Sequence, residues 1–172
     1  MLSNLTIRAS LLVALLVGTP CLAADVGETY HNERFGFHLV YPPKLLRAGP
    51  ESEDGGRRTF EGSGDAARLQ VWGMSNAVGA TPAELAVPLR KQCTSAVRLG
   101  PSSKTLATLS CRIGAQQMTE KIIASGNQLA FLRLTYPVRR AGRWRTPAAA
   151  LVASFTFDPP VRPAAFNARA WH

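Results

Sequence analysis

Five residues near the C-terminal end of the sequence have the types and the spacing of an anion-binding segment. The run 139-RRAGRWR-145 places Arg139, Arg140, Arg143 and Arg145 around Trp144. A guanidinium donates paired hydrogen bonds to a carboxylate or a phosphate, and an indole ring suits a water–lipid boundary or a stacking surface. The segment therefore predicts a contact point for an anionic surface or an acidic protein. The alternative is a solvated loop with Trp144 packed under the domain.

The sequence lacks the motifs of a catalytic or metal site. Its three histidines are His31, His38 and His172, and no HExxH spacing is present. A nucleophile elbow, a phosphate-binding loop and a CxxC pair are also absent. We therefore expect no enzyme activity, no cofactor and no metal. His38 is expected to be a surface or partly hydrogen-bonded residue of a strand.

Cys93 and Cys111 are the two cysteines that remain if the first 24 residues are removed. In an exported chain an even pair predicts a disulfide. A disulfide between them would close a loop of 18 residues (111 − 93). Closing a loop of about this length stabilises a fold by about 3 kcal/mol, mainly because it restricts the unfolded chain. Two buried free thiols are the alternative.

Residues 1–24 have the layout of a secretory signal peptide. Arg8 is followed by an apolar run, 11-LLVALLV-17, which is shorter than the roughly 20 residues that span a bilayer. Small residues then predict cleavage after Ala23 or Ala24. We therefore expect a periplasmic or secreted protein with no transmembrane segment after cleavage. An uncleaved anchor and lipoprotein processing at Cys21 are the alternatives.

The chain is strongly basic, with 20 Lys and Arg against 11 Asp and Glu and a formal net charge of +9 at pH 7. Such a charge attracts anionic partners. Outside the cytoplasm these are anionic lipid, acidic polysaccharide or acidic protein, and not nucleic acid. The alternative is that the charge serves only solubility. The length after cleavage suits one monomeric domain with a real core.

Alternating apolar residues predict a sheet built mainly from hairpins. Strands are predicted at 35–41, 57–62, 67–73, 96–99, 105–114, 117–125 and 128–137. Turns at 62–66 and at Gly126-Asn127 connect neighbouring strands. The segments 25–34 and 43–56 are predicted to be an exposed lead-in and a loop.

Two helices are predicted from capping residues. Thr81, Pro82 and Glu84 begin a helix that ends near 91–92, with a kink or break at Pro88. A second capped start at 146-TP-147 begins a short helix over 148–155. The fold class is α+β, a curved antiparallel β-sheet flanked by two or three short helices. The expected organisation is a signal peptide (1–24), one α+β domain (25–158) and a Pro-rich C-terminal tail (159–172).

Several motifs follow one another in the first half of the chain. The pattern N-x-R-[FY]-G-[FY] begins at Asn32 and leads to Tyr41-Pro42. A Gly-rich turn, an aromatic strand and an alternating strand that ends in Trp72-Gly73 come next, and a later strand ends in Tyr136-Pro137. This succession resembles a group of exported bacterial proteins of unassigned function that is similar to the PsbP-like fold. The resemblance implies a PsbP-like α/β sandwich that acts as a binding or assembly module.

These observations together predict a non-catalytic, exported binding or assembly module. Its partner would be an envelope protein or an anionic lipid or polysaccharide surface. The alternative is a secreted basic enzyme that acts on an acidic envelope polymer. Such an enzyme needs a convergent pair of carboxylates, or a histidine, near a cleft. The acids expected within folded elements are Glu61, Asp65, Glu84 and Glu120.

Overall fold

The computed structural model describes residues 27–159 of the chain. The predicted signal peptide with its cleavage site, and the predicted tail beyond Pro159, lie outside the described residues. Across 27–159 no helix is both long and apolar enough to cross a membrane.

The described chain forms two antiparallel sheets and two α-helices, which confirms the α+β class. The smaller sheet has the order β1 (Glu28–Asn32), β2 (Phe37–Tyr41) and β10 (Thr156–Phe157). The larger sheet has the order β3 (Leu46–Glu51), β4 (Arg57–Gly62), β5 (Arg68–Ser75), β9 (Gln128–Pro137), β8 (Gln116–Ser125), β7 (Leu106–Ile113) and β6 (Arg98–Leu99). The helices are α1 (Pro82–Arg90) and α2 (Ala141–Ser154), and a short 3-10 turn, η1 (Val138–Arg140), precedes α2.

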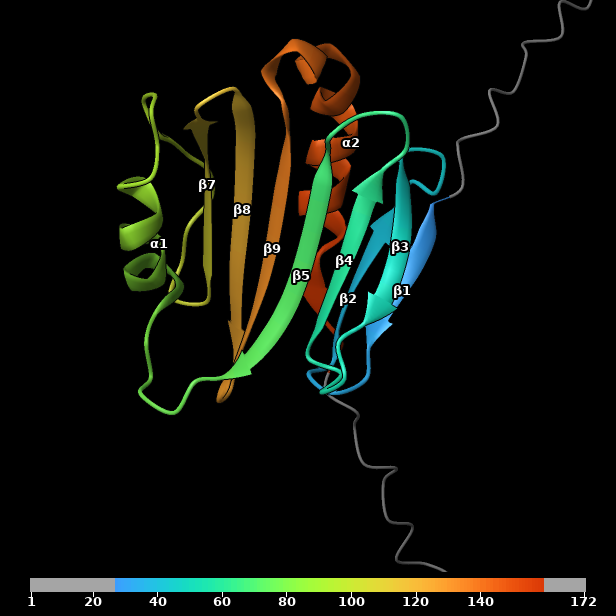
Figure 1. Ribbon diagram of the computed structural model, residues 1–172. Helices are drawn as coiled ribbons and strands as arrows, with labels where there is room; N and C mark the ends of the chain where they lie inside the picture. The colour runs from blue at the N-terminus through green and yellow to red at the C-terminus, as the bar shows by residue number, and fades with distance from the viewer. Residues whose placement is uncertain (1–26, 160–172) are drawn as a thin grey trace, which may run out of the picture.

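The two helices cover opposite faces of the larger sheet. Successive side chains of a strand point to opposite faces, and β9 shows both. Leu132, Leu134 and Tyr136 pack with residues of α2, whereas Leu129 and Phe131 pack in the cluster that contains Ala86 of α1. In Figure 1 α1 lies beside β7 at one edge, and α2 lies behind β5 and β9. We call the two sides of the sheet the α1 face and the α2 face.

Each half of the larger sheet is covered mainly on one face. On the α2 face, the strands β3, β4 and β5 lie under α2 and the smaller sheet, in one core with Phe37, Phe60 and Trp144. On the α1 face, β7 and β8 lie under α1, in a second core with Leu109, Met118 and Ile122. Two half-faces therefore stay largely open, the α1 face of β4 and β5 and the α2 face of β7 and β8, although Leu106 of β7 and Ile123 of β8 pack in the core of the α2 face. The central strand β9 is largely buried on both sides.

Four local predictions need correction. The expected lead-in contains β1, and the expected loop at 43–56 contains β3, which pairs with β4 through a register shift between Ala48 and Glu51. Helix α1 passes through Pro88 without a break and ends two residues later, at Arg90. Helix α2 begins at Ala141 and contains Pro147, because burial of Trp144 draws the arginine-rich segment into the helix.

The motif shared with the resembling group is structural. The buried side chain of Asn32 donates to Tyr30 Oη and to the Gly55 carbonyl, and it accepts from the Phe35 amide. A Cβ atom at Gly73 would lie 2.3 Å from the Phe35 ring, so only glycine fits under that ring. These contacts fasten the β1–β2 turn to the β3–β4 loop and to β5. The motif accordingly indicates fold and gives no information on chemistry.

Candidate functional site

The open α2 face of β7 and β8 is the floor of a groove with a volume of about 690 Å³. The floor is polar and comprises Ser110, Arg112, Gln117 and Thr119. One wall is α2, with Ala141, Arg145, Ala148, Ala149 and Val152, and the other wall is the segment that carries Ser95, Ala96 and Arg98. Tyr136 and Cys111 complete the lining. The groove therefore lies between a helix and an edge strand, over hydroxyl and amide groups.

Three arginines from three separate elements line this groove. Arg98 comes from β6, Arg112 from β7 and Arg145 from α2, and all three are exposed. Register places Arg98 beside Ser110, and Ser110 beside Thr119, on the same face of the sheet. No Asp or Glu is among the residues that line the groove, and within residues 27–159 none of the three arginines forms an ion pair. The groove is therefore a cationic hollow without an internal counter-ion.

The cationic lining continues into a second, smaller hollow. This hollow has a volume of about 300 Å³ and shares Arg112 with the groove. Its other lining residues include Pro137, Val138 and Arg139, at the end of β9 and the start of η1. Arg112 therefore borders both hollows, with Arg98 and Arg145 in the lining of the first and Arg139 in the lining of the second.

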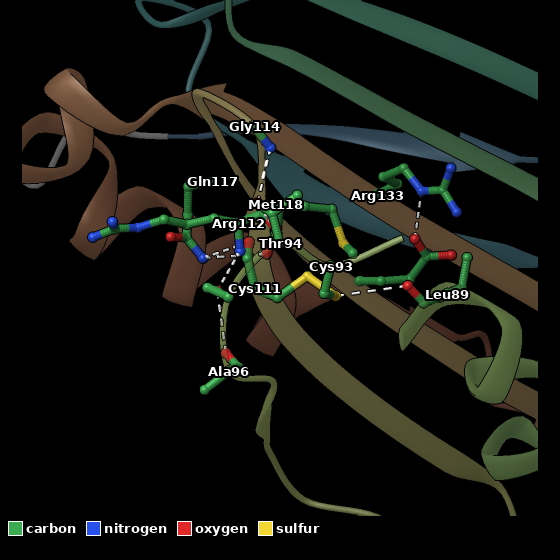
Figure 2. Close-up of a disulfide and its surroundings, with 12 residues drawn as sticks. Leu89, Cys93, Thr94, Ala96, Cys111, Arg112, Gly114, Gln117, Met118 and Arg133 are labelled. Carbon is green, nitrogen blue, oxygen red and sulfur yellow. Dashed lines mark hydrogen bonds and ion pairs between the residues drawn. A yellow bond between two sulfur atoms is a disulfide. The ribbon is translucent and has the colours of Figure 1, made fainter. Parts of the chain in front are cut away.

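A disulfide fixes the outer wall of the groove. Cys93, just beyond the C-terminal end of α1, is bonded to Cys111 of β7, with 5.8 Å between their Cα atoms, as the sequence predicted. Beyond Cys93, the Thr94 amide donates to the Arg112 carbonyl (2.8 Å) and the Arg112 amide donates to Ser95 Oγ (3.0 Å). Figure 2 shows this arrangement around Cys93, Cys111, Thr94 and Arg112. The segment from 94 to 98 is therefore held against β7 at the position that closes the groove.

The helical wall is fixed from the sheet below it. Lys121 of β8 donates from Nζ to the carbonyls of Val152 (2.6 Å) and Phe155 (2.8 Å) at the C-terminal end of α2. An ammonium group suits the negative end of a helix, although burial lowers the pKa of Lys121. Both walls are thus fastened before any ligand arrives.

Tyr136 contributes a neutral hydroxyl to the base of the groove. The residue is 6% exposed, and its ring stacks on Trp144 with 5.7 Å between ring centroids. Burial raises the pKa of its phenol, while the charge of Arg145 acts in the opposite direction. The group therefore stays protonated near neutral pH and can donate a hydrogen bond to an anion.

The predicted segment 139–145 is divided between these surroundings. Arg145 lines the groove and Arg139 lines the adjoining hollow, whereas Arg140 is exposed and lines neither. Arg143 forms an ion pair with Asp65 and donates to the Ser63 carbonyl. Trp144 is fully buried, and its Nε1–H donates to Asp65 Oδ2 at 3.0 Å. Its ring packs in the core, as in the alternative that placed it under the domain, so it offers no surface contact.

Sequence reasoning missed Arg98 and Arg112. Arg98 was one residue of the predicted strand at 96–99, and Arg112 was one polar residue of the predicted strand at 105–114. A signal was present, because β7 and β8 place polar residues on alternate positions, namely Thr108, Ser110, Arg112, Gln117, Thr119 and Lys121. Such a pattern predicts a sheet face that no apolar element covers. Only the strand order could show that Arg98 and Arg145 border the same face.

The four acids considered for an enzyme each have a structural partner. Glu61 pairs with Arg68, and Glu84 completes the capping box of α1 with Thr81. Asp65 accepts from Trp144, as described above. Glu120 is 1% exposed and accepts from Arg133 Nε at 2.5 Å. None of the four lines the groove.

His31 and His38 meet at a single carboxylate, which the sequence did not predict. They face each other on β1 and β2, and Asp158 bridges His31 Nε2 (2.5 Å) and His38 Nδ1 (2.6 Å). The hydrogen bond to Asp158 is the main cause of a raised pKa at His31. In the part of the chain that the structure describes, no group of three or more His, Cys, Asp or Glu residues has a geometry that could hold a metal ion. The cluster joins β10 to the other two strands of the smaller sheet.

No protein-family model matches the sequence, and no curated protein matches it. Solved structures do match the fold. The solution structure of cyanobacterial PsbP (CyanoP) from Synechocystis sp. PCC 6803 has a TM-score of 0.58 at 11% identity, over 83% of this chain and 99% of that one. A protein from Bacteroides thetaiotaomicron VPI-5482 has a TM-score of 0.55 at 12% identity, over 80% of this chain and 51% of that one. The chain therefore has a PsbP-like fold, as the resemblance implied.

Proposed function

We propose that this protein is an exported, non-catalytic binding module that holds an anionic partner in the groove between α2 and the β6–β8 edge. One observation carries the proposal: Arg98, Arg112 and Arg145 line one groove that contains no carboxylate. We therefore propose this groove as the binding site of the anionic partner. From the predicted segment 139–145, Arg145 would contact the partner in the groove and Arg139 in the adjoining hollow.

The electrostatics of the groove support anion binding. A hollow lined by one sign of charge concentrates the field and raises the local concentration of counter-ions. Arginine forks pair with carboxylate or phosphate through two parallel hydrogen bonds. Hydroxyl and amide groups of the floor supply further donors beside them. A bound anion would supply the negative charge that the lining of the groove does not contain.

Export is supported by two features. The Cys93–Cys111 bond fits an oxidising compartment outside the cytoplasm. The first 24 residues have the composition of a cleavable signal.

A fixed groove with both walls fastened and no acid in its lining is better suited to binding than to acid–base chemistry.

The test is a comparison of two charge-reversed variants. The groove variant combines Arg98→Glu, Arg112→Glu and Arg145→Glu. The control combines Arg47→Glu, Arg57→Glu and Arg90→Glu, which changes the net charge equally at exposed positions outside the groove. Binding of fluorescent polyglutamate, polyphosphate and phosphatidylglycerol vesicles would be measured at low and at physiological salt.

We expect at least one of these polyanions to bind, and the groove variant to lose at least about tenfold in affinity. The control should keep nearly all of the affinity at physiological salt. Equal losses in both variants would mean that net charge alone attracts the polyanion, and the proposal would then fail. Circular dichroism and melting curves of both variants establish that each is folded.

A further inference from the structure

We propose that the natural occupant of the groove is a polypeptide segment that carries acidic side chains alternating with small apolar ones. This inference rests on the proposed function, since it names the class of the anionic partner. Three features of the groove support it: small apolar side chains on its walls, hydroxyl and amide groups on its floor, and the absence of an exposed aromatic ring from its lining.

The groove has an apolar strip as well as cations. Ala141, Ala149 and Val152 of α2 face the hollow, and Ala96 lies on the opposite wall. Because these side chains are small, they leave space between the two walls for an occupant. An occupant with charge alone would leave this strip in contact with water, whereas small apolar side chains would bury it. The lining therefore matches an occupant that is acidic at some positions and apolar at others.

The floor suits a peptide backbone. Ser110, Gln117 and Thr119 are partly buried and provide both donors and acceptors. A backbone also presents donors and acceptors along its whole length. Phosphate and carboxylate groups can only accept, so they would use fewer of these groups. The volume of about 690 Å³ lies within the usual range of roughly 300–1,000 Å³ for binding sites, which accommodates a short segment.

An acidic sugar polymer fits this lining less well. Aromatic rings are the large, flat surfaces that protein sites offer for stacking. Tyr136 is the one aromatic residue in the lining of the groove, and its ring is already buried against Trp144. A sugar ring would find no exposed aromatic face there.

A lipid bilayer also fits less well. Attachment to a membrane surface generally adds exposed large apolar side chains to the cationic groups. The exposed large apolar residues of the described chain are Val40, Met74, Val78, Val87 and Leu99. None of them lines the groove, and the groove itself is recessed between α2 and the segment from 94 to 98. A flat surface would therefore not enter the groove.

The experiment uses four probes and two matched variants of the mature chain. The probes are a peptide that alternates Glu with Val, a peptide of equal charge that alternates Glu with Ser, oligogalacturonate, and phosphatidylglycerol vesicles. The variant Ala149→Gln fills the groove without changing the charge. The control Ala150→Gln changes the adjacent exposed residue of α2, which does not line the groove.

We expect the Glu/Val peptide to bind at least about tenfold more tightly than the Glu/Ser peptide. Ala149→Gln should remove most of this preference, and Ala150→Gln should leave it unchanged. Equal affinity for the two peptides would overturn the inference, and so would a preference that survives Ala149→Gln.

The outcomes also separate this inference from the proposed function. Tighter binding of oligogalacturonate or vesicles that still depends on Arg98, Arg112 and Arg145 would keep the groove as an anion site and refute a peptide occupant. If the unaltered protein binds none of the four probes at low salt, both the proposed function and the peptide occupant are refuted.

Discussion

The two open half-faces of the larger sheet both carry arginines, but they differ in what those arginines contact. On the α1 face, Arg68 of β5 pairs with Glu61 of β4 at 3.0 Å, and on the neighbouring strands Arg133 of β9 pairs with the buried Glu120 of β8. Arg57 lies over the ring of Trp72. On the α2 face of β7 and β8, the arginines of the groove have no such partners among the described residues.

This difference separates arginines that serve the fold from arginines available to a ligand. A guanidinium that is already hydrogen-bonded to a carboxylate gains little from a second anion, because the first pairing satisfies part of its charge. A guanidinium without a counter-ion adds to the positive field of the groove. Net charge therefore identifies a basic protein, whereas the local partner of each arginine shows where an anion would bind.

The largest expected effect comes from breaking the pair between Arg133 and the buried Glu120 on the α1 face. Arg133→Ala leaves the carboxylate of Glu120 buried without its cation, and such changes cost about 3–5 kcal/mol. Arg112→Ala removes an exposed side chain from the groove and should change stability by less than about 0.5 kcal/mol. Urea unfolding at neutral pH measures both free energies. Comparable losses of stability in the two variants would erase the distinction between an arginine paired within the fold and an arginine of the groove.

The pH dependence of the Arg133→Ala variant sharpens this prediction. Burial raises the pKa of Glu120 even though Arg133 opposes the shift. Without Arg133 the pKa of Glu120 should rise further. A carboxyl with a raised pKa in the folded state costs stability once it ionises, so the deficit should be largest at neutral pH. It should shrink as the pH falls and Glu120 is protonated.

A somewhat smaller effect is expected from the disulfide at the wall of the groove. Replacing Cys93 and Cys111 together by alanine should lower the free energy of unfolding by about 3 kcal/mol, because the unfolded chain loses a cross-link. The folded variant should also bind polyanions less tightly, since the segment that presents Arg98 is then held only by hydrogen bonds. Urea unfolding and fluorescence titration measure the two effects. Full anion affinity in the variant would show that the wall needs no covalent anchor.

The sequence predicted the elements whose patterns are local. The hairpin of β4 and β5 and the hairpin of β8 and β9 follow from alternation and turn residues, and the structure confirms both. The capping box at Thr81 and the Cys93–Cys111 pair were also predicted correctly. Strand β3 was missed because Gly49 and Pro50 lie in it, and a register shift accommodates them.

The groove could not be predicted because its parts come from distant positions in the chain. Arg98 and Arg112 share an edge of the sheet only because β6 pairs with β7. Arg145 reaches them because α2 begins before the Thr146-Pro147 pair that was expected to start it. The density of arginines at 139–145 located part of the site. The partners of Arg143 and Trp144, which depend on Asp65, removed the rest of the segment from it.

The smallest expected effect concerns the smaller sheet. This sheet covers the α2 face of β3, β4 and β5 and leaves the α2 face of β7 and β8 largely open. Asp158 holds β10 through His31 and His38, and its amide donates to the Gly36 carbonyl at 2.8 Å. The hydrogen bond to Asp158, with a weaker one to Glu33, raises the pKa of His31 above its usual 6.5. Charged His31 therefore stabilises the folded state below that pH, and the stabilisation is lost as the pH rises through the raised pKa.

The carboxyl sets the acid limit of the same contact. Burial alone would raise the pKa of Asp158, but the hydrogen bonds from His38 and His31 lower it below 3.8. Its contribution is present above that pH and is lost as the pH falls through the lowered pKa. Between these limits β10 should be held most firmly.

Hydrogen exchange of the Asp158 amide tests this prediction, after correction for the intrinsic effect of pH. Because His31 is exposed, we expect protection to fall only about two- to threefold between roughly pH 5.5 and 8.5. Asp158→Asn should abolish the dependence on pH, since a neutral amide interacts weakly with either charge state of His31. A dependence that persists in Asp158→Asn would assign the titration to another group. The cover of the α2 face would then be independent of these histidines.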